Sequence, residues 1–337
     1  MRHTEITSVK QLANYLRCKE EFLDIAINHD FNVVEAPLTP KYEYNIINIH
    51  KFHIPKKGRH GGYRTVHAVY TFQLEGILKI LNNYLSDLYD ASASVHGFVS
   101  ERNTKTNAKI HLAKRYVLSV DIDNFFDTIT QKMVQKGIES LGFNSNVADW
   151  IAKITTVNGH LVQGFNTSPT IANIVVSQLD KDFEKLSGES SAAYTRYADD
   201  LYFSSDGNLP EIEEIRSIIE KYGFKLNDRK TVTMKRGQNQ YVTGLTVFDN
   251  KTPRIPKRIK RNLRLEIHKI SQHGYTKHAI RRIKNRVGSL DEDEFVIEIG
   301  KEIIEIQHRL FGWIHYIGSI EPDVADKLFA KLKNAKR

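Results

Sequence analysis

Apolar and polar positions follow helical spacing in several separate stretches of the chain. The pattern predicts helices in the opening segment at about residues 5–28, in "FQLEGILKILNNYLSDLY", and at 146–157, 168–187 and 211–222. In "RYVLSVDIDNFFDTI" the pattern is that of a strand as far as Asp123, and helical signals follow through Leu141.

Strand-like alternation occupies the intervals between these helices. "YNIINIHKFHIPKKGRHGGYRTVHAV" alternates on both sides of a Gly-rich basic stretch, which predicts two strands joined by a turn. Further strands are expected within 224–248. After Thr246 the composition changes, with 13 Lys or Arg against a single acid between Lys251 and Arg286, on a pattern that becomes helical after Pro256. We therefore expect a separate basic, helix-rich C-terminal part.

One strand-like stretch, "YTRYADDLYFSS", contains two adjacent acids, Asp199 and Asp200. Neighbouring residues of a strand point to opposite faces, so the pair requires a turn or a partner for its charge. A tight hairpin with both carboxylates at its tip, beside a divalent metal, satisfies both requirements.

Composition indicates a soluble globular protein with a polyanionic partner. The chain has 337 residues, 40% of them apolar, and a formal charge of +9. A single cysteine, Cys18, excludes internal disulfides and Cys-rich zinc sites. We find no apolar run of about 18 residues and no secretory leader, so we expect a cytoplasmic protein without a membrane segment.

A second acidic site precedes Asp199 by 78 residues: Asp121 closes the apolar strand of "VLSVDIDNFFDTI". Taken alone, such an acid is more often a helix cap. Together, two strand-end carboxylate sites can converge to bind two Mg²⁺ ions about 4 Å apart, as in-line phosphoryl transfer requires.

These motifs resemble those of reverse transcriptases. Asp121, "QGFNTSP" at 163–169 and "YADD" at 197–200 look like motifs A, B and C, in order. The resemblance implies an RNA-directed DNA polymerase with an α+β fold of right-hand architecture, in which fingers and a helical thumb flank a palm with an antiparallel sheet. We expect N-terminal helices and fingers at 1–115, a palm at 116–248 with a fingers-side helix at 146–175, and a basic RNA-binding thumb at 249–337.

The resemblance also implies roles for individual residues. Two Mg²⁺ ions would be bound by Asp121, Asp199, Asp200 and the Ile122 carbonyl, whereas Asp123 is a poorer candidate. Phe126 would select deoxynucleotides, although a phenylalanine here could also be part of the core. The nucleotide would be bound by Gln163 and Gly164, and its triphosphate by Arg64 and either Lys56 or Lys57. Lys230 would protonate the leaving pyrophosphate, but a solvent-facing lysine explains this position nearly as well.

Two short features resemble signatures of bacterial retron reverse transcriptases: "NAKIH" at 107–111 and "VTG" at 242–244, the latter within the primer-grip position. The resemblance implies that the protein uses its own structured noncoding RNA as template, starts DNA synthesis with dNTPs from a guanosine 2′ hydroxyl of that RNA, and yields branched msDNA. It also implies that the resulting nucleoprotein restrains an effector protein in phage defence. The expected RNA or primer contacts are Asn107, His111, Val242, Thr243, Gly244, Lys257, Arg258, Lys260, Arg261 and Arg264.

Two other interpretations remain open. One is a group II intron-like or other bacterial defence reverse transcriptase, which an adjacent noncoding RNA would argue against. The other is an RNA-binding scaffold with an inactive polymerase core, which predicts damage to the metal-binding acids or to Gln163; all of these are intact.

Overall fold

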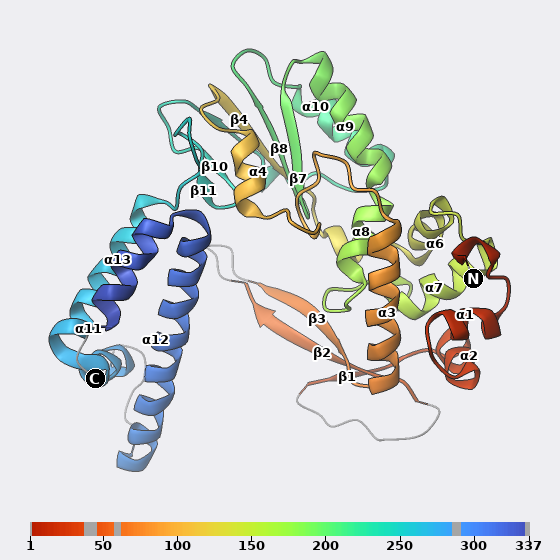
Figure 1. The fold of residues 1–337 in the computed structure, drawn as a ribbon, viewed down its shortest axis with the longest axis horizontal. Coiled ribbons are helices and arrows are strands. Elements are labelled where there is room, and N and C mark those ends of the chain that lie inside the picture. Colours follow the sequence, from red (N-terminus) through yellow and green to blue (C-terminus); the bar gives the residue numbers. More distant parts are fainter. Residues whose placement is uncertain (1, 37–45, 57–61, 285–290, 334–337) are drawn as a thin grey trace. The chain divides into compact units, whose positions relative to one another are not determined.

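The computed structural model describes residues 2–36, 46–56, 62–284 and 291–333, which divide into two compact units. The first unit comprises Met1–Asn103 and Arg115–Met234, and the second comprises Thr104–Lys114 and Lys235–Arg337. Each unit is therefore built from two separate stretches of chain (Figure 1). Among the described residues, no helix is long and apolar enough to cross a membrane.

A four-stranded sheet in the order β7-β8-β4-β9 forms the centre of the first unit. Its strands are β4 (Tyr116–Asp121), β7 (Ala193–Tyr197), β8 (Asp200–Ser205) and β9 (Val232–Lys235). Strand β8 pairs antiparallel with both β4 and β7. Leu118, Leu201 and Phe203 are at most 1% exposed, because helices cover the sheet and bury this apolar set. The hairpin expected around "YADD" is thus confirmed.

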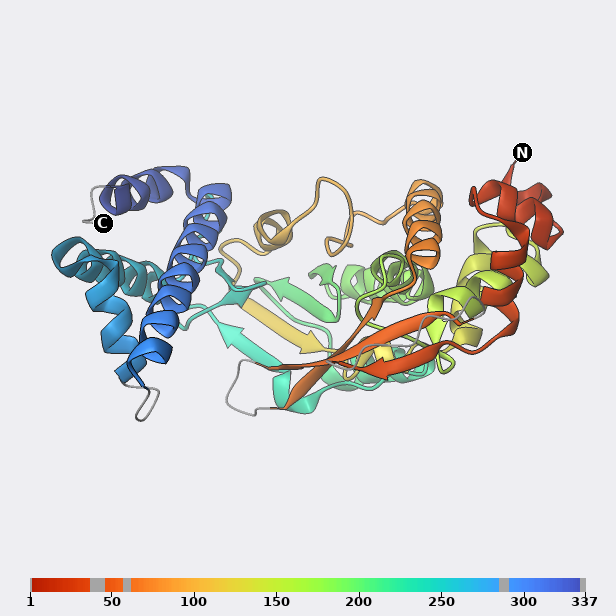
Figure 2. The ribbon, with the colours of Figure 1, turned by 90° about the horizontal axis from the view of Figure 1, so that it is seen from below.

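Helices of the first unit surround this sheet, and most occupy the expected segments. Figure 1 shows α9 and α10 side by side next to β7 and β8, and in both views α3 runs beside α8 (Figure 2). The bounds are η1 (His3–Glu5), α1 (Val9–Tyr15), α2 (Glu20–Asn28), α3 (Phe72–Leu88), α5 (Phe125–Thr128), α6 (Gln131–Ser140), α7 (Ser145–Thr155), α8 (Ser168–Val175), α9 (Ser177–Glu189), α10 (Ile212–Lys221) and η2 (Asp228–Lys230).

The prediction of one continuous fingers-side helix over 146–175 is wrong, because this segment contains two helices separated by a hairpin. Between α7 and α8 lie β5 (Thr156–Val157) and β6 (His160–Leu161). Asn158 and Gly159 form the turn with φ of 51° and 77°, a conformation that cannot continue a right-handed helix. Pro169 stands in the first turn of α8, where its missing N–H leaves no helical hydrogen bond unmade.

A second sheet of the first unit has the order β1-β2-β3. The expected pair of strands is confirmed as β2 (Asn48–Pro55) and β3 (Tyr63–Val69), which are antiparallel. A short strand that the pattern did not predict, β1 (Asn32–Glu35), pairs parallel with β2. Lys57, expected to contact the triphosphate, lies outside the described residues.

The second unit is mainly helical. Its elements are α4 (Thr104–Ile110), β10 (Tyr241–Val242), β11 (Leu245–Thr246), α11 (Lys257–Lys284), α12 (Glu292–Ile320) and α13 (Pro322–Lys333). Of the strands expected within 224–248, the described part of the chain has only β9 and this two-residue pair. Helix α11 is kinked at Gly274, whose φ of 77° breaks the helical path. Ile267, Leu310 and Ile317 contribute to the apolar core of this unit.

Candidate active site

Two acids from distant parts of the chain meet on neighbouring strands of the central sheet. In the antiparallel register of β4 and β8, Asp121 stands directly opposite Asp200. On the other side of β8, Tyr197 pairs with Asp200, which leaves Ala198 and Asp199 as a two-residue loop. The backbone N–H of Ile122 donates to the Asp199 carbonyl at 3.0 Å. The structure therefore brings Asp121, Ile122, Asp199 and Asp200 to one end of the sheet.

Burial and neighbouring acids oppose the ionisation of Asp199 and Asp200. Burial raises the pKa of Asp200 to about 7, with the negative charges of Asp199 and Asp121 as further causes. Burial also raises the pKa of Asp199, and Asp121 adds to this effect. The Arg64 guanidinium on β3 acts in the opposite direction on Asp199, so this predicted phosphate contact is electrostatically coupled to the acids.

The Asp121 carboxylate is held by two side chains that follow α10. Asn227 donates from Nδ2 to Oδ1 at 2.9 Å, and Lys230 Nζ lies 2.8 Å from Oδ2. Burial by itself would lower the pKa of Lys230, but its hydrogen bond to Asp121 and the charges of the three acids raise it overall. Lys230 thus carries a proton beside the carboxylates. Asn227 was missed at the sequence level, although it lies three residues before Lys230 in "LNDRK".

The donor set matches a hard divalent cation. In the part of the chain that the structure describes, no three His, Cys, Asp or Glu side chains are grouped around a common point, and the Lys230 ammonium is the cation in contact with Asp121. The raised pKa of Asp200 is due partly to its acidic neighbours, and a divalent ion would relieve this repulsion between negative charges. Carboxylate oxygens are the ligands that Mg²⁺ prefers. Asp121, Asp199 and Asp200 therefore have the donor chemistry for a divalent cation, which would compete with Lys230 for the Asp121 carboxylate.

Phe126 is half-buried and lies beside two other rings. Its ring centroid is 5.4 Å from that of Phe125, which is 3% exposed and belongs to the core. The ring of Phe98 meets Phe126 edge-on at 6.5 Å and is 48% exposed. Phe98 was not predicted; its only sequence signal is an aromatic residue within the Gly- and Ser-containing stretch "ASASVHGFVS".

The Gln163–Gly164 segment packs against β3. The Gln163 carbonyl accepts from His67 N–H at 2.7 Å. Gly164 has φ of 114°, and a Cβ there would lie 2.2 Å from the His67 carbonyl oxygen. Glycine is thus required by a close approach of two backbones within the protein. The contact fixes the predicted nucleotide-binding segment to the strand that carries Arg64.

The two short signature motifs lie together in the second unit. Thr243 Oγ1 donates to the Thr104 carbonyl at 3.0 Å, which joins the turn between β10 and β11 to α4. Asn107, His111 and Val242 have no exposed surface, so in this structure they pack inside the protein. Gly244, with φ of 78°, has open space around its Cα.

Basic side chains cover the beginning of α11. Lys257, Arg258, Arg261 and Arg264 are exposed around a cavity of about 790 Å³. Lys260 differs, because its Nζ lies 2.8 Å from Glu321 Oε1 in an ion pair that is largely buried. A neighbouring cavity of about 1120 Å³ brings Gly244 and Tyr241 together with Lys257 and Arg258. The second unit therefore presents cations and an aromatic ring at one surface.

Residues 54–254 match the family described as reverse transcriptase (RNA-dependent DNA polymerase). Among curated relatives, the retron Mx65 reverse transcriptase of Myxococcus xanthus is 34% identical over 239 residues, which cover 64% of this chain and 55% of that protein. The retron Ec86 reverse transcriptase of Escherichia coli is 29% identical over 237 residues, 69% of this chain and 71% of that protein. The match thus spans about half the length of the first relative.

Solved structures also resemble the chain. Apo telomerase from Candida tropicalis is 15% identical, with a TM-score of 0.44 over 88% of this chain and 62% of that one.

Proposed function

This chain belongs to the reverse transcriptase family, and from that membership we propose that it synthesises DNA on an RNA template. Family membership and the mixed helices and antiparallel sheets agree with the α+β polymerase fold expected from the sequence. The observation that carries the proposal is the register of the central sheet, which sets Asp121 opposite Asp200 with Asp199 in the adjoining loop. Three acids in this arrangement suit nucleotidyl transfer assisted by divalent ions.

We assign residues 1–115 to the N-terminal helices and fingers, 116–248 to the palm and 249–337 to the thumb. The compact units divide the chain differently, because Thr104–Lys114 packs with residues after Met234. Within this assignment, the metal-binding acids belong to the palm and the basic start of α11 to the thumb.

Two bound Mg²⁺ ions would activate the attacking hydroxyl and neutralise the departing pyrophosphate. Asp121, Asp199, Asp200 and the Ile122 carbonyl would hold them. Lys230, displaced from Asp121, would carry its proton toward the pyrophosphate.

Other side chains of the first unit would bind and select the nucleotide. Arg64 suits a bidentate phosphate contact, and a lysine at 56 or 57 suits a second one. Gln163 and Gly164 would contact the base or sugar. Phe126 would exclude a 2′ hydroxyl by occupying the space that it requires.

The similarity to retron reverse transcriptases supports a more specific proposal about substrate and partners. The protein would copy its cognate structured noncoding RNA, starting from a guanosine 2′ hydroxyl, and would leave branched msDNA attached to it. The exposed cations of α11 would bind RNA phosphates. The resulting nucleoprotein would restrain an effector protein in phage defence.

The decisive experiment combines sequencing of copurifying nucleic acid with primer extension. We expect covalently joined RNA and single-stranded DNA in the purified protein, and Mg²⁺-dependent incorporation of dNTPs. Replacing Asp199 and Asp200 together with Asn should abolish incorporation while RNA binding persists. Asp123→Asn is the matched control, because its side chain interacts with Asn124 at an exposed position.

Full incorporation by the Asp199→Asn, Asp200→Asn protein would refute the proposed chemistry. DNA synthesis from added primers alone, with no branched product, would support the related group II intron-like or other defence enzymes instead.

A further inference from the structure

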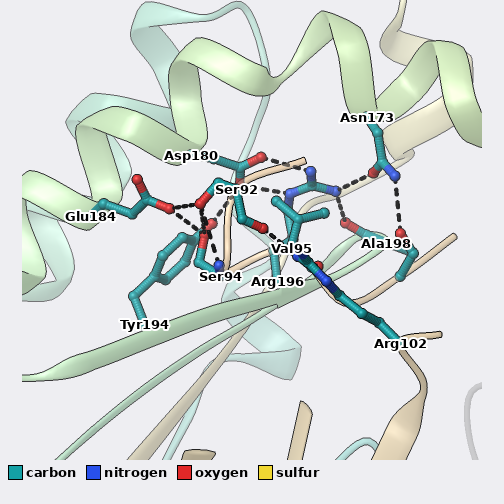
Figure 3. A network of polar contacts seen from close by, with 11 residues as sticks. Ser92, Ser94, Val95, Arg102, Asn173, Asp180, Glu184, Tyr194, Arg196 and Ala198 are labelled. Carbon is teal, nitrogen blue, oxygen red and sulfur yellow. Dashed lines mark hydrogen bonds and ion pairs between the residues drawn. The ribbon is translucent and has the colours of Figure 1, made fainter. Parts of the chain in front are cut away.

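A buried arginine lies directly behind the loop that carries the metal-binding acids. Arg196, on β7, is 0% exposed, and its Nε and Nη2 donate to the two oxygens of Asp180 on α9, each at 2.7 Å (Figure 3). The Asp180 charge more than offsets the effect of burial, so the pKa of Arg196 is raised and the guanidinium stays charged. The pair is bidentate, which fixes the plane of the guanidinium as well as its position.

The remaining edge of this guanidinium contacts the loop. Arg196 Nη1 donates to the Ala198 carbonyl at 3.2 Å and to Asn173 Oδ1 at 2.9 Å. Ala198 is the first residue of the two-residue loop and has φ of 58°, a conformation that a residue with a side chain adopts only when its surroundings impose it.

Asn173 extends the contact to a second segment. It lies on α8, the helix that follows the Gln163–Gly164 segment, and donates from Nδ2 to the Gly97 carbonyl at 2.9 Å. A Cβ at Gly97 would lie 2.4 Å from the Ala198 nitrogen, so this backbone lies directly against the loop. The Gly97 segment is itself fixed, because Arg102 Nη1 donates to the Val95 carbonyl at 2.6 Å.

These contacts exceed what stability alone requires. Burying an ion pair is expensive, and apolar side chains of similar volume commonly stabilise a core as well or better. The Arg196 guanidinium does something that apolar side chains could not do. It connects α8, α9 and β7 to the loop whose conformation sets where the Asp199 and Asp200 carboxylates point. An apolar side chain can fill the same space but cannot orient a carbonyl group.

We propose that Arg196, oriented by Asp180 and Asn173, is a positioning residue for the metal-binding acids. It fixes the Ala198–Asp199 loop, and it ties that loop to the helix following the nucleotide-binding segment. The inference rests on the proposed function, since it assigns Arg196 to the site where the metals would bind.

The test compares Arg196→Lys with Tyr194→Phe. Lysine keeps the buried charge beside Asp180 but lacks the fork that reaches the Ala198 carbonyl and Asn173. Tyr194 OH donates at 2.8 Å to Asp180 Oδ1, the oxygen that also accepts from Arg196 Nε. Tyr194→Phe therefore removes one buried hydrogen bond from the network without removing a contact to the loop. Two quantities are measured: Mn²⁺ affinity without nucleic acid, by electron paramagnetic resonance, and kcat and KM for single-nucleotide extension.

Both variants should lower the melting temperature. Arg196→Lys should also weaken Mn²⁺ binding several-fold and lower kcat about 10- to 100-fold, as expected for misplaced reacting groups, with the KM for dNTP near that of the wild type. Tyr194→Phe should retain wild-type Mn²⁺ affinity and kcat. Equal Mn²⁺ affinity and kcat in the two variants would overturn the inference.

If Arg196→Lys does not fold, Asn173→Ala replaces it, because it keeps the ion pair and removes the acceptor that orients Nη1. The two proposals can fail separately. A wild-type protein that binds Mn²⁺ but extends no primer would refute the proposed function, and the comparison of Mn²⁺ affinities would still decide the role of Arg196.

Discussion

Asp121 and Asp200 face each other across β4 and β8, and the Asp121 charge helps burial to raise the pKa of Asp200. Their strands are the two most deeply buried of the central sheet, with Val120 and Leu201 completely covered. A pair of acids placed here destabilises the folded chain unless a proton or a cation compensates, which is the usual condition of a functional carboxylate cluster.

Asp200→Asn should therefore stabilise the metal-free protein at alkaline pH. Because the folded-state pKa of Asp200, about 7, exceeds its ordinary value of 3.8, the stabilising contribution of this group is complete below about pH 4. It is lost as the pH rises through 7. Thermal unfolding with a chelator should show a melting temperature several degrees higher for the variant at pH 8, and a much smaller gap at pH 5. A gap independent of pH would contradict this account, and Mg²⁺ should narrow it at pH 8.

Lys230→Met should separate metal binding from catalysis. The ammonium competes with a metal ion for Asp121 Oδ2, so its removal should tighten Mn²⁺ binding several-fold. Primer extension should become slower, because the proton donor is lost. The side chain is 62% exposed, so we expect little change in stability, about 0–1 kcal/mol. Lys230→Arg is the charge-preserving control and should leave metal affinity near the wild-type value; weaker Mn²⁺ binding in Lys230→Met would be inconsistent with competition.

Phe126→Val should admit ribonucleotides. The smaller side chain removes the ring that would collide with a 2′ hydroxyl, so discrimination in primer extension should fall by about 10-fold or more, the effect expected from a change of 1–3 kcal/mol. Phe125→Leu is the matched control: Phe125 is buried in the core, so this change should lower stability and leave sugar selection intact. Unchanged discrimination in Phe126→Val would remove Phe126 from the nucleotide site.

Gly164→Ala should displace the segment that carries Gln163. The added methyl group would lie 2.2 Å from the His67 carbonyl oxygen, so one of the two backbones must move. Gly159→Ala provides the control, since Gly159 also has a positive φ, 77°, but open space around it. We expect Gly164→Ala to lose about 1–3 kcal/mol more in denaturant unfolding, and to raise the KM for dNTP. Equal losses in both variants would show that backbone conformation alone requires these glycines.

Charge removal along α11 should distinguish RNA-binding from structural cations. Lys257→Ala and Arg261→Ala should each weaken RNA binding and reduce the slope of log affinity against log salt by about 1, because each exposed cation releases a counterion on binding a phosphate. Lys260→Ala should instead lower the melting temperature, since it removes the ammonium that pairs with the largely buried Glu321 carboxylate and leaves the Ile255 N–H as its nearest remaining donor. Identical salt slopes in Lys257→Ala and the wild type would exclude Lys257 from the RNA contact.

Local sequence patterns sufficed for the parts of the site that depend on strand alternation. Two acids next to each other in an apolar strand require a turn, and the two-residue loop at Ala198 and Asp199 is that turn. An acid at the end of another buried strand could then be expected beside it, as Asp121 is.

Contacts that depend on distant partners could not be predicted in this way. Arg196 reads as an ordinary strand residue in "YTRYADD", and nothing nearby indicates that Asp180 and Asn173 surround it. Apolar spacing is helical at 146–157 and again from 168, but it does not show that the residues between these helices form a hairpin with Asn158 and Gly159 as its turn. The burial of Asn107 depends on packing within a unit completed by residues far along the chain.

The discontinuity of the second unit affects how the protein can be made and altered. Thr104 is joined by a hydrogen bond to Thr243, 139 residues later, so a ribosome releases α4 long before its partner exists. Until then the side of α4 that carries Asn107 and Ala108, buried in the folded protein, must remain uncovered or be shielded by a chaperone. For the same reason, transplanting a relative's C-terminal part onto this protein at a single junction would give α4 a foreign partner. A working chimera needs two exchanges, one of them at 104–114.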